Sequence, residues 1–117
     1  MSGDAPFYFD NTCHNTWLAK AWLGLAKSYT YFALGHVLRD EHDRVVVEAD
    51  HALYMYGHYK YHMAKLSLSV PPEEEEAMQS VEDMRLAHAS AQKNKEDQES
   101  LQRINEYFSA LENKEDQ

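Results

Sequence analysis

The sequence VVVEADHALYMYGHYKYHMAKL, residues 45–66, carries two series of side chains that are spaced alternately by three and four residues. This spacing keeps side chains on one face of an α-helix, so each series predicts a stripe along the same helix. The apolar stripe consists of Val45, Ala49, Ala52, Tyr56, Tyr59, Met63 and Leu66, and the polar stripe consists of Glu48, His51, Met55, His58 and His62. A helix with two stripes is expected to have two neighbours.

A second amphipathic helix is predicted upstream, from about residue 16 to about residue 38. Its apolar stripe consists of Leu18, Trp22, Leu25, Tyr29, Phe32 and His36, whereas Lys20, Lys27 and Tyr31 fall on the far side. The polar segment RDEHDR, residues 39–44, separates the two helices and offers Asp40 or Asp43 as an N-cap. We expect an antiparallel hairpin in which the numbers of paired residues add to about 83, with Trp22 near Tyr61. One unbroken helix stays open, because neither Gly nor Pro occupies the segment.

The chain beyond the hairpin is predicted to be helical and peripheral. Pro71 and Pro72 end the second helix, and the four glutamates that follow favour a new helix start. A thin stripe of Ala77, Val81, Met84, His88 and Ala91 predicts a third helix, and Leu101, Ile104, Phe108 and Leu111 predict a short fourth helix after the polar AQKNKEDQ segment. The fold class is therefore all-α, a helical hairpin extended to a three- or four-helix bundle-like arrangement. The expected parts are an N-terminal segment (1–15), an aromatic-rich hairpin core (16–70) and an acidic C-terminal part (71–117).

Charge and aromatic residues are distributed unevenly along the 117 residues. Residues 1–70 hold 7 acidic and 6 basic side chains, whereas residues 71–117 hold 13 acidic and 5 basic ones. The C-terminal part is thus unsuited to direct nucleic-acid binding, which needs clustered Lys and Arg. Twelve of the 14 aromatic residues lie between Phe7 and Tyr61, so the N-terminal half is expected to carry the core. Cys13 is the only cysteine, which excludes an intrachain disulfide and favours a reducing intracellular compartment.

The polar stripe contains two pairs of candidate metal ligands. Glu48 and His51 form an E-x-x-H pair, and His58 and His62 are four residues apart. The first spacing is similar to the pairs in ferritin-like di-iron bundles. Such a site also takes carboxylates from neighbouring helices, and residues 17–38 contain none. We therefore expect no cofactor and no metal at His58 and His62, with a His-rich metal-binding bundle as the alternative.

The first predicted helix allows a second interpretation, as a membrane span. Residues 17–38 are long enough for a membrane span, but the central Lys27 disfavours insertion by about 2.5–3.5 kcal/mol. A single span inside a larger complex stays open.

Gly24, Gly35 and Gly57 lie within predicted helices, where glycine costs about 1 kcal/mol of helix stability relative to alanine. We therefore expect these glycines to mark points where helices approach closely.

The function expected from these patterns is structural. The chain is interpreted as a non-enzymatic accessory or adaptor subunit, without catalytic residues, that binds protein partners or further copies of itself through helical stripes. The expected interface consists of His51, Tyr54, Met55, His58, Tyr61 and His62. Two alternatives are the metal-binding bundle and an acidic inhibitor that mimics nucleic acid in a basic cleft.

Overall fold

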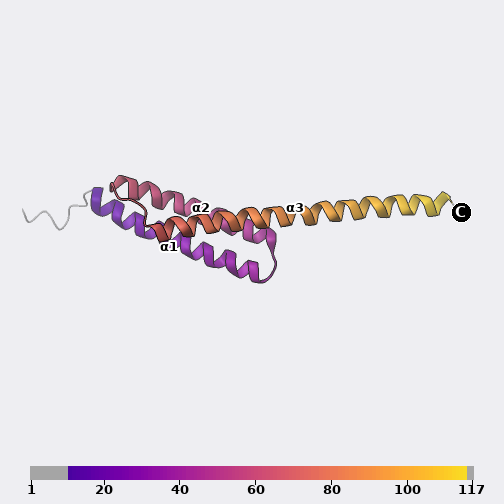
Figure 1. The fold of residues 1–117 in the computed structure, drawn as a ribbon, viewed down its shortest axis with the longest axis horizontal. Helices are drawn as coiled ribbons and strands as arrows, with labels where there is room; N and C mark the ends of the chain where they lie inside the picture. The colour runs from indigo at the N-terminus through magenta and orange to yellow at the C-terminus, as the bar shows by residue number, and fades with distance from the viewer. Residues whose placement is uncertain (1–10, 116–117) are drawn as a thin grey trace, which may run out of the picture.

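The computed structural model describes residues 11–115, which form three α-helices and no strand. They are α1 (Asn11–Leu38), α2 (His42–Lys65) and α3 (Pro72–Glu115). Helices α1 and α2 form an antiparallel hairpin, and α3 runs back along it in the direction of α1 and continues far beyond the hairpin turn (Figure 1). The molecule is accordingly elongated, with extents of 97, 26 and 21 Å. The prediction of an all-α protein with a hairpin is confirmed, and the alternative of one unbroken helix is wrong.

The hairpin turn is closed by backbone hydrogen bonds around Asp40. This residue has φ = 59°, in the left-handed region. The backbone N–H of Glu41 donates to the carbonyl oxygen of His36 at 3.0 Å, and the N–H of Asp40 donates to that of Val37 at 3.1 Å. The pair of bonds is a Schellman motif, which usually has glycine at its left-handed position. Aspartate tolerates this conformation better than most residues, so the turn forms without Gly or Pro.

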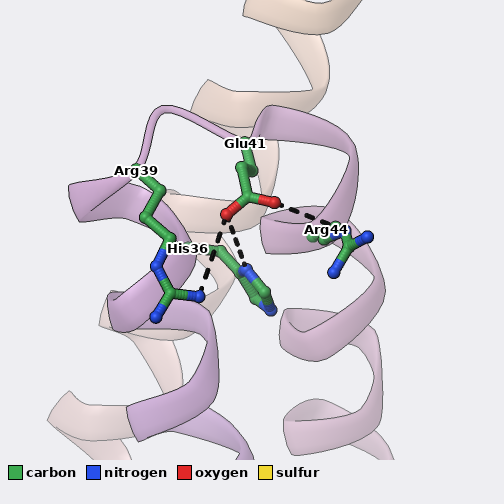
Figure 2. A network of polar contacts seen from close by, with 4 residues as sticks. All are labelled: His36, Arg39, Glu41 and Arg44. Atoms are coloured by element: carbon green, nitrogen blue, oxygen red, sulfur yellow. Dashed lines mark hydrogen bonds and ion pairs between the residues drawn. The ribbon is translucent and has the colours of Figure 1, made fainter.

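The side chain of Glu41 then joins the two helix ends across this turn (Figure 2). One carboxylate oxygen lies 3.4 Å from Nδ1 of His36 and 4.0 Å from Nη1 of Arg39, and the other lies 3.4 Å from Nε of Arg44. Both arginines are largely exposed, so each ion pair contributes little by itself. Their common anchor is Glu41, which fixes where α2 leaves the turn.

The core lies between the three helices and confirms the apolar stripe of α2. Its buried members are Val45, Ala49, Ala52, Tyr56 and Tyr59. Helix α1 contributes mainly alanines, Ala19, Ala26 and Ala33, which are spaced by seven residues, and α3 contributes Val81. Large side chains on α2 therefore meet small ones on α1, which lets the two helices approach closely.

The predicted apolar stripe of α1 is only partly correct. Leu25 is 44% exposed and Phe32 is 58% exposed. The buried stripe is the one formed by Ala19, Ala26 and Ala33. Because successive helical residues are 100° apart, this stripe is rotated by about 80° around the helix from the predicted one. The physical reason is volume, because Tyr56 and Tyr59 occupy the space between the helices and leave room only for alanine on the facing side of α1.

The register of the hairpin also differs from the prediction. The ring of Trp22 stacks on His58 at 4.2 Å between centroids, and Tyr29 meets His51 at 5.1 Å. The numbers of these paired residues add to 80. Trp22 therefore lies beside His58 and not Tyr61. The shift arises because the turn is centred on Asp40, whereas the prediction centred it on the whole polar segment.

The predicted break between a third and a fourth helix is wrong, since α3 is continuous from Pro72 to Glu115. The segment AQKNKEDQ is polar but contains neither Gly nor Pro. Its side chains stabilise the helix locally, as where the amide of Gln92 donates to Glu96 at 3.4 Å. From residue 93 to residue 114 every side chain of α3 is exposed, and we call this segment the arm. None of the helices within residues 11–115 combines the length and the apolar character that crossing a membrane requires.

Candidate interaction surfaces

The polar stripe of α2 packs against α1 of the same chain. His62 is buried, and its Nδ1–H donates to the side-chain oxygen of Asn15 at 2.7 Å. His58 stacks on the indole of Trp22. The two neighbours of α2 are thus α1 and α3. His58 and His62 were predicted to lie at an interface with another chain, and in the structure both contact α1. Their contact with a partner stays a prediction.

The four candidate metal ligands are occupied with one another or with α1. Glu48 lies 3.9 Å from His51 in the same helix, and His51 also meets the ring of Tyr29 edge-on. His58 and His62 contact α1 as described above. Within residues 11–115 no three His, Cys, Asp or Glu side chains converge on a point where an ion could bind.

The environment of His62 lowers its pKa below the ordinary value of 6.5. Burial is the main cause, and the nearby His58, His14 and Lys65 add positive charge that opposes protonation. The neutral ring suits the geometry, because it donates one N–H to Asn15 and needs no counter-ion.

This lowered pKa predicts a pH dependence of stability. The unfolded chain binds the proton of His62 more readily than the folded chain. The stability that depends on the neutral ring is present above the unfolded pKa of about 6.5 and is lost as the pH falls from there through the lower folded pKa. In urea unfolding, the free energy of unfolding should therefore fall more between pH 7.5 and pH 5.5 for the wild type than for His62→Gln. His51→Gln changes an exposed ring and should show the same decrease as the wild type. An equal decrease in all three proteins would contradict the prediction.

Three residues of the predicted interface remain open to solvent. His51, Tyr54 and Tyr61 are exposed, and Met55 is half-buried. With Gly57, His58 and His62, the two tyrosines line a shallow depression of about 430 Å³. Binding of a partner at this depression stays a prediction.

A second stripe, which was not predicted, lies on α1 on the side away from α2 and α3. Its residues are again spaced by four and three: Trp17, Ala21, Gly24, Ser28, Tyr31, Gly35 and Leu38. Trp17 and Tyr31 are each 72% exposed and Leu38 is 89% exposed. A hollow of about 550 Å³ lies beside Trp17. We call this stripe the outer face of α1, and its heptad spacing was visible in the sequence.

The glycines of α1 belong to this outer face. A Cβ atom built at Gly24, Gly35 or Gly57 would meet nothing within 4 Å among the described residues. The prediction that these glycines mark close helix approach is therefore wrong for contacts among residues 11–115.

The arm carries the predicted stripe of Leu101, Ile104, Phe108 and Leu111, and all four side chains are exposed. At 100° per residue this stripe points about 160° away from the stripe that buries Val81. It is therefore not an extension of the hairpin core. Tyr107 packs edge-on against Phe108 at 5.7 Å and adds to the apolar surface.

Comparison with known proteins adds no relative to this description. No protein-family model matches the chain, and neither a curated protein nor a solved structure was found to be similar to it.

Proposed function

We propose that the chain is a non-enzymatic accessory or adaptor subunit. Its hairpin is the folded part from which the arm projects, and the arm docks on a helical protein partner. The arm supports this proposal most strongly. It projects beyond the hairpin turn as a helix (Figure 1). Its apolar side chains are exposed and lie on one face. The bundle-like arrangement expected from the sequence would then be completed by helices of the partner.

The length of the arm gives a physical reason for a partner. Twenty-two residues of helix, 93–114, span about 33 Å and lie outside the hairpin. Helices of this kind are only marginally stable alone in water, and most helical stability comes from packing an apolar face. Four apolar residues at heptad spacing are what a helical groove or a coiled-coil partner recognises.

The charge of the arm is compatible with a protein partner. It carries Glu and Asp at five positions and Lys and Arg at four, so it is nearly neutral although the C-terminal part as a whole is acidic. Mixed charges beside an apolar stripe set the orientation of helix pairs rather than attract nucleic acid.

The test replaces two stripe residues of the arm in the full chain. Leu101→Glu with Phe108→Glu places two charges on the docking stripe, and Ser109→Glu with Asn113→Glu adds the same charge away from it. In the cells that make the protein, tagged wild type and control should migrate on native gels in a particle larger than a dimer. The stripe variant should leave that particle while keeping its helical circular dichroism.

Two outcomes would contradict the proposal. One is a wild type that never exceeds the size of a dimer at native levels. The other is equal retention of the stripe variant and the control in the larger particle.

A further inference from the structure

We infer that the outer face of α1 binds the same face of a second copy of this chain, with the two helices antiparallel. This inference deepens the proposed function. It rests on that function in one respect, because it also treats the chain as a docking subunit. It concerns α1 and a second copy, whereas the proposed function concerns the arm and a different protein.

The composition of the outer face favours burial. Three of its seven residues are large and exposed (Trp17, Tyr31, Leu38), and the other four are Ala, Gly, Ser and Gly. Residues 17–38 contain no carboxylate, and Lys27 is turned toward Glu74 of α3 at 3.3 Å. Only Lys20 places a charge at the edge of the face, and its long stem lets the ammonium stay in water. Two such faces can therefore meet without like-charge repulsion at their centre.

The order of large and small residues makes the face complementary to itself. When two copies of α1 run antiparallel about a two-fold axis midway between Gly24 and Ser28, each of the two aromatic residues is level with a small one, and Leu38 is level with His14, beyond the end of the face. Trp17 then lies opposite Gly35 of the second copy, and Tyr31 lies opposite its Ala21. At the centre Gly24 meets Ser28. A two-fold interface requires this kind of self-complementarity.

A parallel arrangement does not have this property. It would bring each residue against its own counterpart, so that two tyrosines at position 31 collide and two glycines at position 24 leave a void. Both overpacking and voids are destabilising. The sequence of the face thus selects the antiparallel pair.

The glycines supply a separate argument. Gly24 and Gly35 lower the stability of α1 without fitting any neighbour in the chain, because a Cβ at either position meets nothing within 4 Å in the described part of the molecule. An approaching helix explains them. The absence of a side chain at Gly35 lets the ring of Trp17 of the second copy lie against the backbone, and at Gly24 it lets the two helices come close beside Ser28.

The dimer has a consequence for the arms. Because α3 runs in the direction of α1 and passes the hairpin turn, an antiparallel α1 pair places the two arms at opposite ends (Figure 1). One particle would then present two docking helices that point away from each other. A partner with two binding sites would gain affinity from such a pair.

Thiol crosslinking tests the orientation in purified full-length protein. In a Cys13→Ser background, Ser28→Cys places two thiols about 6 Å apart along the helix axis, within reach of a short bismaleimide. Leu38→Cys places them about 36 Å apart in the antiparallel pair but side by side in a parallel one. We expect a crosslinked dimer for Ser28→Cys and none for Leu38→Cys. Crosslinking at both positions, or at neither, would overturn the inference.

Glycine substitutions separate dimerisation from folding. Gly24→Ala and Gly35→Ala should each raise the melting temperature of dilute, monomeric protein, because alanine favours the helix and meets nothing within the described chain. Combined, they should weaken self-association about tenfold or more in analytical ultracentrifugation, because the added methyl groups overpack the pair. Gly57→Ala on α2 is the matched control, and it should stabilise the fold without changing the dimer.

The two proposals fail separately. A wild type that stays monomeric at every concentration overturns the dimer and leaves arm-dependent docking intact. A stable dimer whose arm variants remain in the native particle overturns the docking role alone.

Discussion

Tyr56→Ala is expected to lower the free energy of unfolding by about 3–5 kcal/mol, the range for truncating a large buried aromatic side chain. Tyr56 is 2% exposed and belongs to the cluster that includes Ala26, Ala49 and Ala52. Alanines have no spare atoms with which to fill the space that the ring would leave. The decrease in unfolding free energy should therefore have two parts. One is the lost free energy of burying the ring, and the other is the cost of the cavity that stays behind.

The hydroxyl of Tyr56 allows a second measurement at the same position. Burial raises the pKa of this phenol, with a smaller contribution from the negative charge of Glu74, and a hydrogen bond with Thr30 acts in the opposite direction. Tyr56→Phe keeps the ring and removes only the hydroxyl, so it should cost about 0.5–1.5 kcal/mol, the usual net value of one hydrogen bond.

Leu101→Ala and Leu25→Ala are the controls for urea unfolding. Leu101 lies on the exposed arm, and its truncation should cost well under 1 kcal/mol, because there is little buried surface to lose. From the sequence, Leu25 was expected to be as costly as a core leucine. At 44% exposed it should fall between the two other variants. Equal losses for Tyr56→Ala and Leu101→Ala would show that the arm is part of the folded core.

The sequence predicted α2 best, because two physical signals agree there. Heptad spacing places Val45, Ala49, Ala52, Tyr56 and Tyr59 on one face, and the same residues are the large and small members of a tightly packed core. The end of the helix was also readable, since proline cannot continue it. Periodicity and local sequence thus determined this element without knowledge of its neighbours.

Helix α1 was harder because two faces of it carry heptad spacing. The bulky residues at Leu25 and Phe32 made one face look like the core, whereas Ala26 and Ala33 form it. Which face is buried depends on the volume left beside the tyrosines of α2, and that volume is a tertiary property. The heptad spacing of the outer face was present in the sequence. Four of its seven residues are Ala, Gly or Ser, so the face did not read as an apolar stripe.

The contacts of the polar stripe depended on register, which a sequence pattern does not determine to within one turn. The first helix was predicted to begin at about residue 16, but α1 begins at Asn11. Asn15 therefore lies within the helix, and its side chain accepts a hydrogen bond from His62. A shift of three in the paired numbers was enough to exchange Tyr61 for His58 as the neighbour of Trp22. Such exchanges decide whether a histidine is a ligand or a packing partner.

Val81→Asp is the second substitution with a large expected effect, about 3–5 kcal/mol, because it places an unpaired carboxylate at a buried site. Among the described residues of α3, Val81 is the one that is fully buried, at 2% exposed. Ala77, Met78 and Met84 of α3 are partly buried against the same core. The remaining links from α3 to the hairpin are polar: Lys27 with Glu74, Arg85 with Asp50, and His42 with His88. Partly exposed polar pairs of this kind contribute little each, so the apolar contact at Val81 should dominate.

Hydrogen exchange would locate the damage in this variant. The amides of residues 72–92 should lose protection first, and those of the buried face of α2 should follow, because α3 covers part of that face. Ala87→Asp adds the same charge at an exposed position of α3 and should leave protection close to that of the wild type. Equal protection in both variants would show that α3 is not held through Val81.

Acid should partly restore the Val81→Asp variant, which distinguishes a buried charge from a simple loss of volume. Burial disfavours the ionised form, so the introduced carboxyl should have a folded pKa above its unfolded value of about 3.9. The destabilisation is then complete above the folded pKa and shrinks as the pH falls toward the unfolded one. Val81→Ala removes volume without adding charge, so its loss relative to the wild type should not change with pH. If the two variants kept a constant difference in unfolding free energy between pH 7 and pH 4, the carboxyl would be solvated, and position 81 would not be buried between α3 and the hairpin.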